Sequence, residues 1–547
     1  MRRIWAVARQ TFAQCLRMKV AAAFILLLAI VLAAMPAFMT GDGTLAGRIR
    51  TLLNYGSALT ALLLSAVTIF VSVAVVASDV ADKQVFLVAT KPLARWQYVL
   101  GRWLGVVAMD VMLLACAGGA IYAFAQVLRT RPALTPEDRT AVETEVFAAR
   151  RRVSPAPPDV QARVDQRIAR FKDEGRFDDA VDAYKTRSRG DRDRAEQYLL
   201  RQITQEETTA AQSVGVGGVF LWKFQAVRVS GTELAARGTV TEVNPQAGAF
   251  RIRASPRLLG RLVYAGPVRV EGLDGRVIRL EDDYFEVLFG PEEARRPALQ
   301  ALAPGREVAL IADPIIQVSF KASPANPPPD KMIPSLWQVR NPSTNFFYQE
   351  ARSDRADRPN TFTLSARTVD PQGRTEIAYV NVPLNLTTGT GTSVTILNSD
   401  VAVLYRVGGF EANFLKALAL ILIQLVFLAA AGVCAGTFLS FPVACLVVFA
   451  TLPLGLARDF MTTATTVSAI ESHPTIKQIG GAALSIVKVF LPDFARTDPS
   501  TALVGGMDLA WTDLGAAAAW VLAMRGAIVL ALACLVFSRR ELARVQV

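Results

Sequence analysis

Long apolar runs occupy the two ends of the chain, and a polar stretch occupies its middle. Three apolar runs lie near the N-terminus, at residues 20–41, 51–78 and 103–128, and the third carries a single charge, Asp110. Each run has 22 to 28 residues, which is long enough for a helix to cross the roughly 30 Å hydrocarbon layer of a membrane. The pattern therefore predicts three transmembrane spans before residue 129. A cleaved signal peptide is an alternative for the first run, but nineteen residues precede it and no A-x-A site follows.

A second apolar region lies toward the C-terminus. Residues 417–457 are uncharged over 41 positions, too many for one crossing, and Gly436 and Pro442 near the middle favour a tight turn. We therefore predict two antiparallel spans there. A sixth span is predicted over residues 514–538, where Arg525 is the only charge.

In the polar middle of the chain, the spacing of apolar residues changes from a helical to an alternating pattern. Thr135 followed by Pro136 marks a helix start, and we expect helices up to about residue 210. From Trp222 onward, apolar and polar residues alternate, as in residues 250–252, 268–270 and 316–320, which is typical of half-buried strands. Residues 227–229 show the same alternation, and residues 325–330 read as a linker between two sheet regions.

These patterns predict the fold class: an α-helical membrane protein with six transmembrane helices and an α+β extracytoplasmic domain. That domain has a helical, hairpin-like part followed by a β-sandwich-like part. The expected divisions are an interfacial amphipathic helix at 1–19, spans one to three at 20–128, a helical region at 129–215, a β-rich region at 216–412, spans four to six at 413–538 with an outer loop at 458–513, and a tail at 539–547.

The distribution of charge predicts the orientation. The chain has 59 Lys and Arg against 47 Asp and Glu, and basic residues outnumber acidic ones before residue 20, between spans two and three, and in the tail. Basic loops stay in the cytoplasm. We therefore expect a multi-pass protein of the inner (cytoplasmic) membrane, with both termini cytoplasmic and residues 129–412 extracytoplasmic. The same argument accounts for the excess of basic residues, so we expect membrane lipid as a partner and no nucleic acid.

The first nineteen residues form their own feature. Apolar side chains recur there at helical spacing, among them Trp5, Ala8 and Cys15, with arginines elsewhere around the helix. This pattern is typical of a helix that lies in the membrane interface. A short basic tail that only sets the topology is the alternative.

Residues suited to catalysis are scarce. The five cysteines lie in or beside the apolar ends, His473 is the only histidine, and no G-x-x-x-x-G-K-[ST] motif occurs. A zinc site, a Cys–His pair, a Ser–His–Asp triad and a nucleotide-binding P-loop therefore have no basis in the sequence. We expect no catalytic, cofactor-binding or metal-binding residue, and any energy source must come from another chain.

The segment between spans two and three, residues 79–102, is the most informative. Asp79 and Asp82 end span two, and they are followed by Pro92, Arg95, Tyr98 and Gly101-Arg102. This arrangement resembles the cytoplasmic coupling region of type-2 ABC transporter permeases, in which an acidic residue and a short helix precede Pro-x-x-Arg, an aromatic residue and Gly-Lys/Arg. The chain departs from the Glu-x-Glu-x-Gly-Thr pattern common in that family, and the resemblance does not extend to residues 129–416.

The resemblance implies a non-catalytic permease subunit of an ATP-driven ABC transporter, acting in export or in mechanical work. A separate ABC ATPase subunit would bind ATP and Mg²⁺, and the permease would form a homodimer or pair with a similar permease. The residues that would contact the ATPase or position this segment are Asp79, Asp82, Lys83, Phe86, Leu87, Lys91, Pro92, Arg95, Tyr98, Gly101 and Arg102.

Other interpretations of the chain stay open at this level. An ordinary basic loop is the alternative for the segment itself. A membrane-anchored envelope binding or scaffold protein with a β-sandwich ectodomain is the alternative function. A membrane-embedded enzyme is a third, weakened by the scarcity of catalytic residues.

Two charges lie inside predicted spans, Asp110 in span three and Arg525 in span six. A charge at the centre of a membrane costs at least about 2.5 kcal/mol, so we hypothesise that the two side chains pair. The alternative is that either faces a water-filled cavity or reaches toward the interface. Residues 479–491 are apolar around Lys488 and too short to span; they resemble the re-entrant segment on the outer side of the same family, and a buried ectodomain helix is the alternative.

Overall fold

The computed structural model divides the chain into two compact units. Unit 1 comprises residues Met1–Ala149 and Gly408–Val547, and unit 2 comprises Arg150–Val407. The structure describes residues 2–38, 43–81, 94–157, 160–184, 191–229, 234–244, 249–253, 268–270, 275–281, 284–289, 304–312, 314–344, 346–383, 391–457, 494 and 498–539.

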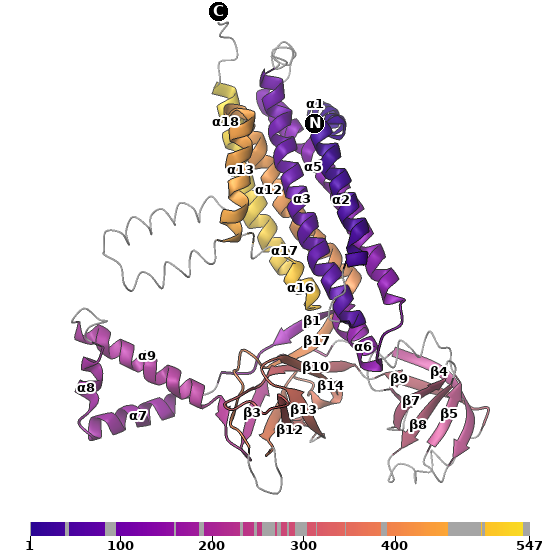
Figure 1. The fold of residues 1–547 in the computed structure, drawn as a ribbon, viewed down its shortest axis with the longest axis vertical. Helices are drawn as coiled ribbons and strands as arrows, with labels where there is room; N and C mark the ends of the chain where they lie inside the picture. Colours follow the sequence, from indigo (N-terminus) through magenta and orange to yellow (C-terminus); the bar gives the residue numbers. More distant parts are fainter. Residues whose placement is uncertain are drawn as a thin grey trace, which may run out of the picture. The chain divides into compact units, whose positions relative to one another are not determined.

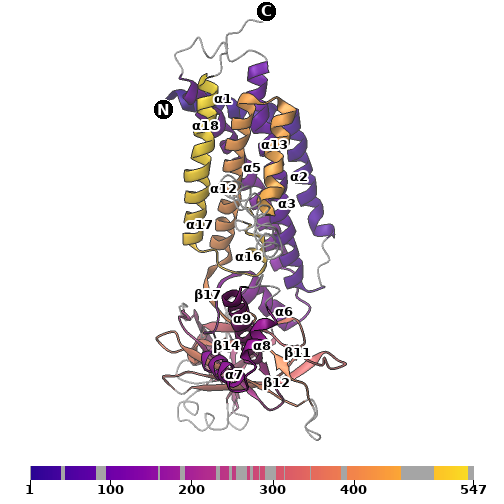
Figure 2. The same ribbon diagram turned by 90° about the vertical axis from the view of Figure 1, so that its left-hand side faces the viewer.

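Unit 1 is a bundle of helices that run side by side (Figures 1 and 2). Its elements in chain order are α1 (Arg2–Arg17), α2 (Lys19–Phe38), α3 (Leu45–Ala81), α5 (Arg95–Arg129), α6 (Pro136–Ala141), the π-helix η1 (Val142–Val146), α12 (Phe410–Phe438), α13 (Phe441–Leu456), α16 (Ser500–Val504), α17 (Trp511–Ala517), the π-helix η4 (Ala518–Gly526) and α18 (Ala527–Arg539).

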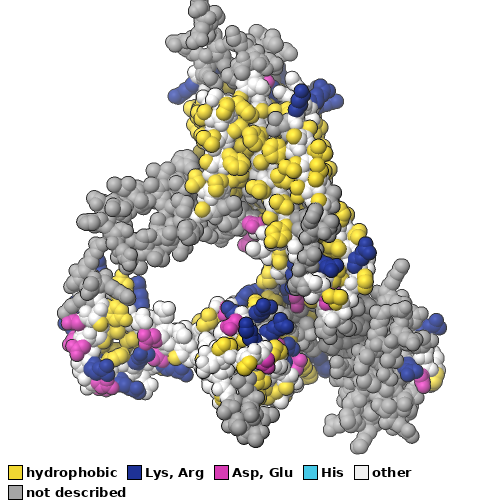
Figure 3. Space-filling view, in the orientation of Figure 1, with side chains coloured by type: hydrophobic (Ala, Val, Ile, Leu, Met, Phe, Trp, Pro, Cys, Tyr) yellow, Lys and Arg dark blue, Asp and Glu magenta, His cyan; other side chains and the backbone are white. Residues whose placement is uncertain are grey.

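Four helical stretches in the described residues are long and apolar enough to cross a membrane: Leu45–Asp79, Arg95–Arg129, Phe410–Phe438 and Trp511–Arg539. The count reaches five if α1 and α2, which meet at a bend of 64°, form one span. The uncharged run at 417–457 is indeed broken, between α12 and α13, but α13 has only 16 residues, fewer than the roughly 20 that a straight crossing needs. On the face shown in Figure 3, many apolar side chains of these helices are exposed. These features are typical of a membrane protein.

Small residues allow the central helices α3 and α12 to approach closely. A Cβ atom on Gly432 of α12 would lie 1.8 Å from Oγ of Ser72 on α3, and one on Gly436 would lie 3.1 Å from the carbonyl oxygen of Val73. Only glycine therefore fits at position 432, where the backbone of α12 contacts the Ser72 side chain of α3. This packing makes α12 the most buried of the four long apolar helices, with 72% of its apolar window inside the structure.

Polar contacts hold α6 and the loop before α17 onto the long helices. The carboxylate of Asp138 accepts hydrogen bonds from the backbone N–H groups of Leu45, at 2.8 Å, and Ala46, at 3.0 Å, and so caps the N-terminus of α3. Lys416 of α12 forms a buried ion pair with Asp508 at 2.9 Å. The contacts of Asp138 hold α6 against α3, and unit 1 extends to Ala149, past residue 129, where the extracytoplasmic region was predicted to begin.

Unit 2 contains two four-stranded sheets that share one core. The first has the order β1 (Ala148–Val153), β17 (Ala402–Gly409), β10 (Ile315–Lys321), β14 (Pro359–Ser365), and the second has the order β13 (Phe347–Arg355), β12 (Met332–Arg340), β15 (Thr375–Asn381), β3 (Val219–Phe224). β10 pairs antiparallel with β14 and β17, and β12 pairs antiparallel with β13 and β15. Phe320 of the first sheet packs against Trp337 of the second, with ring centroids 4.5 Å apart. A β-sandwich results, as the alternation predicted.

A six-stranded antiparallel sheet is inserted in the sequence between β3 and β10. Its order is β6 (Val268–Val270), β9 (Glu307–Ala312), β4 (Leu234–Asn244), β5 (Ala249–Arg253), β8 (Tyr284–Phe289), β7 (Gly275–Glu281). A small sheet has the order β11 (Ser323–Pro324), β16 (Val394–Thr395), β2 (Ser213–Val214). Residues 325–330 therefore connect β11 of the small sheet to β12 of the second four-stranded sheet.

The predicted helical region is confirmed in part. Thr135 is the N-cap of α6, as expected, and α7 (Gln161–Asp173), α8 (Phe177–Asp182) and α9 (Arg192–Ala210) follow. The strand β1 interrupts this region. A small apolar cluster that includes Val164, Val181 and Leu199 holds α7, α8 and α9 together.

One predicted strand is absent. Residues 227–229 do not form a strand, because Ala226 before them adopts a left-handed backbone with φ of 63° and ends the run of β3.

Candidate functional site

The predicted ATPase-coupling residues lie at the junction of α3 and α5. The structure describes Asp79, Arg95, Tyr98, Gly101 and Arg102, with Asp79 near the end of α3 and the other four in the first turns of α5. The remaining coupling residues, Asp82, Lys83, Phe86, Leu87, Lys91 and Pro92, lie outside the described residues, as do His473 and residues 479–491.

A buried ion pair lies at the centre of this junction. Arg102 pairs with Asp79, and the Tyr98 hydroxyl donates a hydrogen bond to the same carboxylate oxygen. All three residues are at most 5% exposed. A buried charge pair is stable only when its geometry and its further hydrogen bonds compensate for the loss of water. Here the phenol supplies such a bond, so the end of α3 is tied to α5 by charge and by hydrogen bonding.

The guanidinium of Arg102 also reaches α1. Its Nη1 donates to Oε1 of Gln14 at 2.6 Å and lies 3.2 Å from Oγ1 of Thr11. We call Asp79, Tyr98, Arg102, Thr11 and Gln14 the Asp79 cluster. It joins α1, α3 and α5.

Sequence reasoning missed Thr11 and Gln14, because it considered only the apolar face of α1. The buried face instead consists of Ala8, Thr11 and Cys15, which recur at positions i, i+3 and i+7, while Trp5 is 70% exposed. The small and polar side chains at these positions are the signal that could have indicated that α1 packs against other helices.

Two glycines on α5 let α1 approach its backbone. A Cβ atom on Gly101 would lie 2.6 Å from Cβ of Val7, and one on Gly105 would lie 2.4 Å from Cβ of Thr11. Gly101 and Gly105 form a G-x-x-x-G pattern, whose role is to expose a flat strip of backbone to a neighbouring helix. The predicted residue Gly101 thus has a structural role as one half of the strip that receives α1.

The fifth described residue, Arg95, reaches the end of α18. Its Nη1 donates to the carbonyl oxygens of Ser538, at 2.6 Å, and Phe537, at 3.3 Å. A cation is favourable at the C-terminus of a helix, where backbone carbonyls lack partners. The ring of Tyr98 stacks on that of Phe537 with centroids 5.2 Å apart. The start of α5 is therefore linked to α18 as well as to α1 and α3.

The two intramembrane charges are not brought together. Asp110 is fully buried, and its Oδ1 lies 2.7 Å from Oγ1 of Thr68 on α3. The guanidinium of Arg525 lies over the ring of Trp520, 5.3 Å from its centroid. Among the described residues the hypothesised ion pair is not formed, because Asp110 faces α3 rather than η4.

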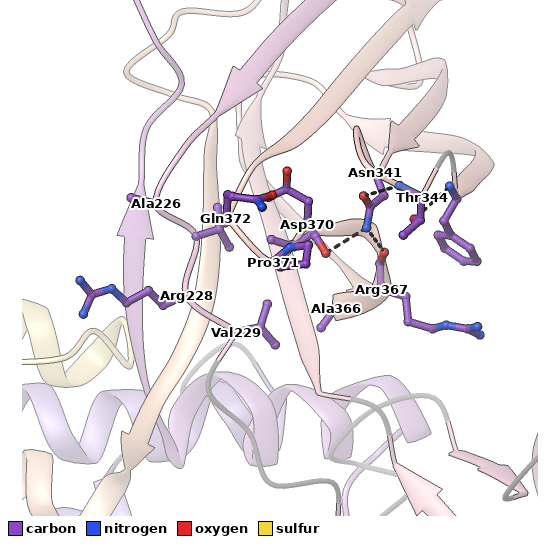
Figure 4. A pocket seen from close by; sticks show the side chains of 14 residues that line it. Ala226, Arg228, Val229, Asn341, Thr344, Ala366, Arg367, Asp370, Pro371 and Gln372 are labelled. Atoms are coloured by element: carbon purple, nitrogen blue, oxygen red, sulfur yellow. Dashed lines mark hydrogen bonds between the residues drawn. The ribbon is translucent and has the colours of Figure 1, made fainter.

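Unit 2 contains a recess of about 1020 Å³, and two of its polar lining residues, Asn341 and Asp370, form hydrogen bonds within the protein (Figure 4). The side-chain amide of Asn341 donates to the carbonyl oxygens of Arg367, at 2.8 Å, and Val369, at 3.0 Å. Burial by itself would raise the pKa of Asp370, but hydrogen bonds from the backbone and guanidinium of Arg374 outweigh it and lower the pKa. These hydrogen bonds fix the conformation of the loop.

The described residues contain no group of three or more His, Cys, Asp or Glu side chains that could hold a metal ion.

Comparison with known proteins adds no assignment. No protein-family model matches the chain, and no curated protein and no solved structure is detectably similar to it.

Proposed function

We propose that this chain is the membrane-spanning permease subunit of an ATP-driven ABC transporter. In this proposal the chain crosses the inner membrane six times, both termini and residues 82–93 are cytoplasmic, and residues 129–412 are extracytoplasmic. A separate ATPase subunit binds ATP and Mg²⁺, and this chain performs no covalent chemistry. Two permease subunits act as a dimer.

The observation that carries the proposal is the connection of one short segment to four helices. Residues 82–93 join α3 to α5, and the anchors on either side of them are Asp79 and Arg95. Arg102, which pairs with Asp79, extends these contacts to α1, and Arg95 extends them to α18. A displacement of the segment would therefore be transmitted to α1, α3, α5 and α18 together, which is what a coupling element requires.

The mechanism follows from differential binding. A partner can shift the arrangement of the bundle only if each of its nucleotide states binds one arrangement better than the other. Leu87 and Phe86 provide apolar contact for a groove on the ATPase, while Lys83 and Lys91 steer the encounter through their charge. ATP binding and hydrolysis in the partner would then drive the helices between two states.

Co-purification tests the proposal. The full chain is isolated from native membranes in mild detergent, and the proteins that elute with it are identified by mass spectrometry. The Leu87→Asp variant is compared with Leu134→Asp, which makes the same change at a residue that is 74% exposed beyond the other end of α5. We expect an ATPase with a Walker motif to elute with the wild type and Leu134→Asp and to be lost from Leu87→Asp. The absence of any ATPase in the wild-type sample contradicts the proposal.

A second candidate function is a membrane-anchored envelope binding or scaffold protein. The recess of about 1020 Å³ in unit 2 favours it, because a β-sandwich with an open recess can hold a ligand without any energy source. The same co-purification separates the two functions. An envelope component eluting in place of an ATPase supports the scaffold.

A further inference from the structure

Asp110 lies in surroundings unsuited to a carboxylate. It occupies the middle of α5, which runs from Arg95 to Arg129, and its side chain is completely buried. Its neighbours on the inward side of α5 are apolar, among them Val106 and Leu113. Its second oxygen, Oδ2, has no hydrogen-bond partner among the described residues. An ionised carboxylate in such a place lacks both water and a compensating charge.

None of the described helices that pack against α5 supplies that compensating charge. The helix α3 has no charged residue between Arg50 and Asp79, and α12 has none after Lys416. The helix α2 has none after Lys19. Arg102 lies two turns away on α5 and is paired with Asp79.

Two further elements pack against α5. On α1, the titratable group near Asp110 is the thiol of Cys15, which also interacts with Arg102. On α18 the only charged residue is Arg539, at its far end.

The hydroxyl of Thr68 lies within hydrogen-bond distance of two oxygen atoms but has one proton. Its Oγ1 lies 2.7 Å from the carbonyl oxygen of Leu64 and 2.7 Å from Oδ1 of Asp110. A hydroxyl has one proton and two acceptor lone pairs, and a backbone carbonyl can only accept. When Thr68 donates to Leu64, the short contact with Asp110 is a hydrogen bond only if the carboxyl group is the donor.

We propose that Asp110 is a proton-binding site in the interior of the bundle and that the conformation seen here holds the proton. Binding forms one O–H bond on Oδ1 and neutralises the carboxylate, and the proton comes from water and returns to water. The protonated group donates to Thr68, which donates to Leu64. A conformation that admits water to Asp110 stabilises the carboxylate and releases the proton. Proton release is therefore linked to any rearrangement that separates α3 from α5 at this point.

Infrared spectroscopy of the full chain in lipid nanodiscs tests the proposal. A protonated carboxyl group has a C=O stretching band that is well separated from the carboxylate bands and shifts in D₂O. We expect the difference between wild type and Asp110→Asn at neutral pH to show the loss of one protonated-carboxyl band. Asp165→Asn, at an exposed position on α7, should remove only carboxylate signal. Loss of carboxylate signal from Asp110→Asn overturns the proposal.

A second variant keeps the test decisive if Asp110→Asn does not accumulate. Thr68→Val retains the carboxyl group and removes its acceptor. We expect the protonated-carboxyl band to shift to higher frequency in this variant, because the O–H group loses its hydrogen bond. An unchanged spectrum in Thr68→Val overturns the proposed contact.

Discussion

Asp79 and Arg102, 23 positions apart in the chain, form an ion pair in which neither side chain is more than 6% exposed. The pair lies between α3 and α5, and Arg102 extends it to α1 through Gln14. Removing one partner of such a pair leaves the other as a buried charge without compensation. This destabilises the folded protein more than replacing both partners by apolar residues. The junction is therefore sensitive to single substitutions.

Arg102→Leu should lower the free energy of unfolding by about 3–5 kcal/mol, because Asp79 is left as an unpaired buried carboxylate. The measurement is the unfolding temperature of the full chain in detergent. Arg17→Leu, which removes an exposed arginine from α1, serves as the control and should change little. The double variant Asp79→Asn/Arg102→Leu should recover part of the loss. A double variant no more stable than Arg102→Leu would contradict the buried-pair interpretation.

Gly105→Ala should weaken the docking of α1, because the added Cβ would lie 2.7 Å from the carbonyl oxygen of Ala8 and 2.4 Å from Thr11. Limited trypsin digestion checks this, since a displaced α1 unfolds more readily and trypsin then cleaves its backbone at Arg9 and Arg17, whose side chains are already exposed. The matched control is Gly119→Ala on the same helix, where nothing lies within 4 Å of the new methyl group. Alanine stabilises a helix interior by about 0.5–1 kcal/mol relative to glycine, so Gly119→Ala should be neutral or stabilising. Equal cleavage of both variants would show that α1 does not depend on this strip.

Asp138→Ala should destabilise unit 1 by about 1 kcal/mol, because the N-terminus of α3 loses two hydrogen bonds from a carboxylate distant in the chain. Hydrogen exchange of the peptide that begins at Leu45 measures the effect locally. Asp138→Asn keeps an acceptor oxygen and should retain most of the protection. Asp191→Ala removes the exposed cap of α9 and should leave the exchange of α3 unchanged. Protection of α3 that survives Asp138→Ala would show that the cap has no energetic role.

Asp370 should make the stability of the full chain depend on acid pH. Its pKa is lowered in the folded state, although burial opposes the change, because Arg374 donates hydrogen bonds to the carboxylate. A carboxyl group with a lowered folded pKa contributes stability above its unfolded pKa, about 3.9, and this contribution is lost as the pH falls through the folded pKa. The difference in unfolding temperature between wild type and Asp370→Asn should be largest near pH 6 and shrink below pH 4. A difference that is constant with pH would exclude this linkage.

The proposed orientation predicts which residues an impermeant thiol reagent reaches. In a variant without the native cysteines, Asp165→Cys on α7 should be labelled in intact right-side-out membrane vesicles. Arg17→Cys on α1 should be labelled only after the vesicles are opened, because basic segments remain in the cytoplasm. Both positions are exposed. The reverse labelling pattern would overturn the orientation.

Much of the coarse fold could be predicted because it depends on local patterns in the sequence. Apolar runs of more than 20 residues, uncharged except for Asp110 in α5, indicate α2, α3, α5 and α12, and the change to alternating apolar and polar residues indicates the strands of unit 2. Two details could not be predicted. Ala226, with its left-handed backbone, interrupts an alternating run. The carboxylate of Asp138 binds the N-terminus of α3, which lies far away in the sequence, and so attaches α6 to unit 1.

The candidate site shows the same division. The sequence by itself determined the type and spacing of Asp79, Arg95, Tyr98, Gly101 and Arg102, because a short motif is a local property of the chain. Only the tertiary structure decided what these residues touch: α1 at Thr11 and Gln14, α18 at Ser538, and for Asp110 the hydroxyl of Thr68 rather than the guanidinium of Arg525. The physical reason is that partner choice depends on how helices rotate and approach one another. Glycines and small side chains control that approach, and they are difficult to recognise as site residues in a sequence because they carry no charge.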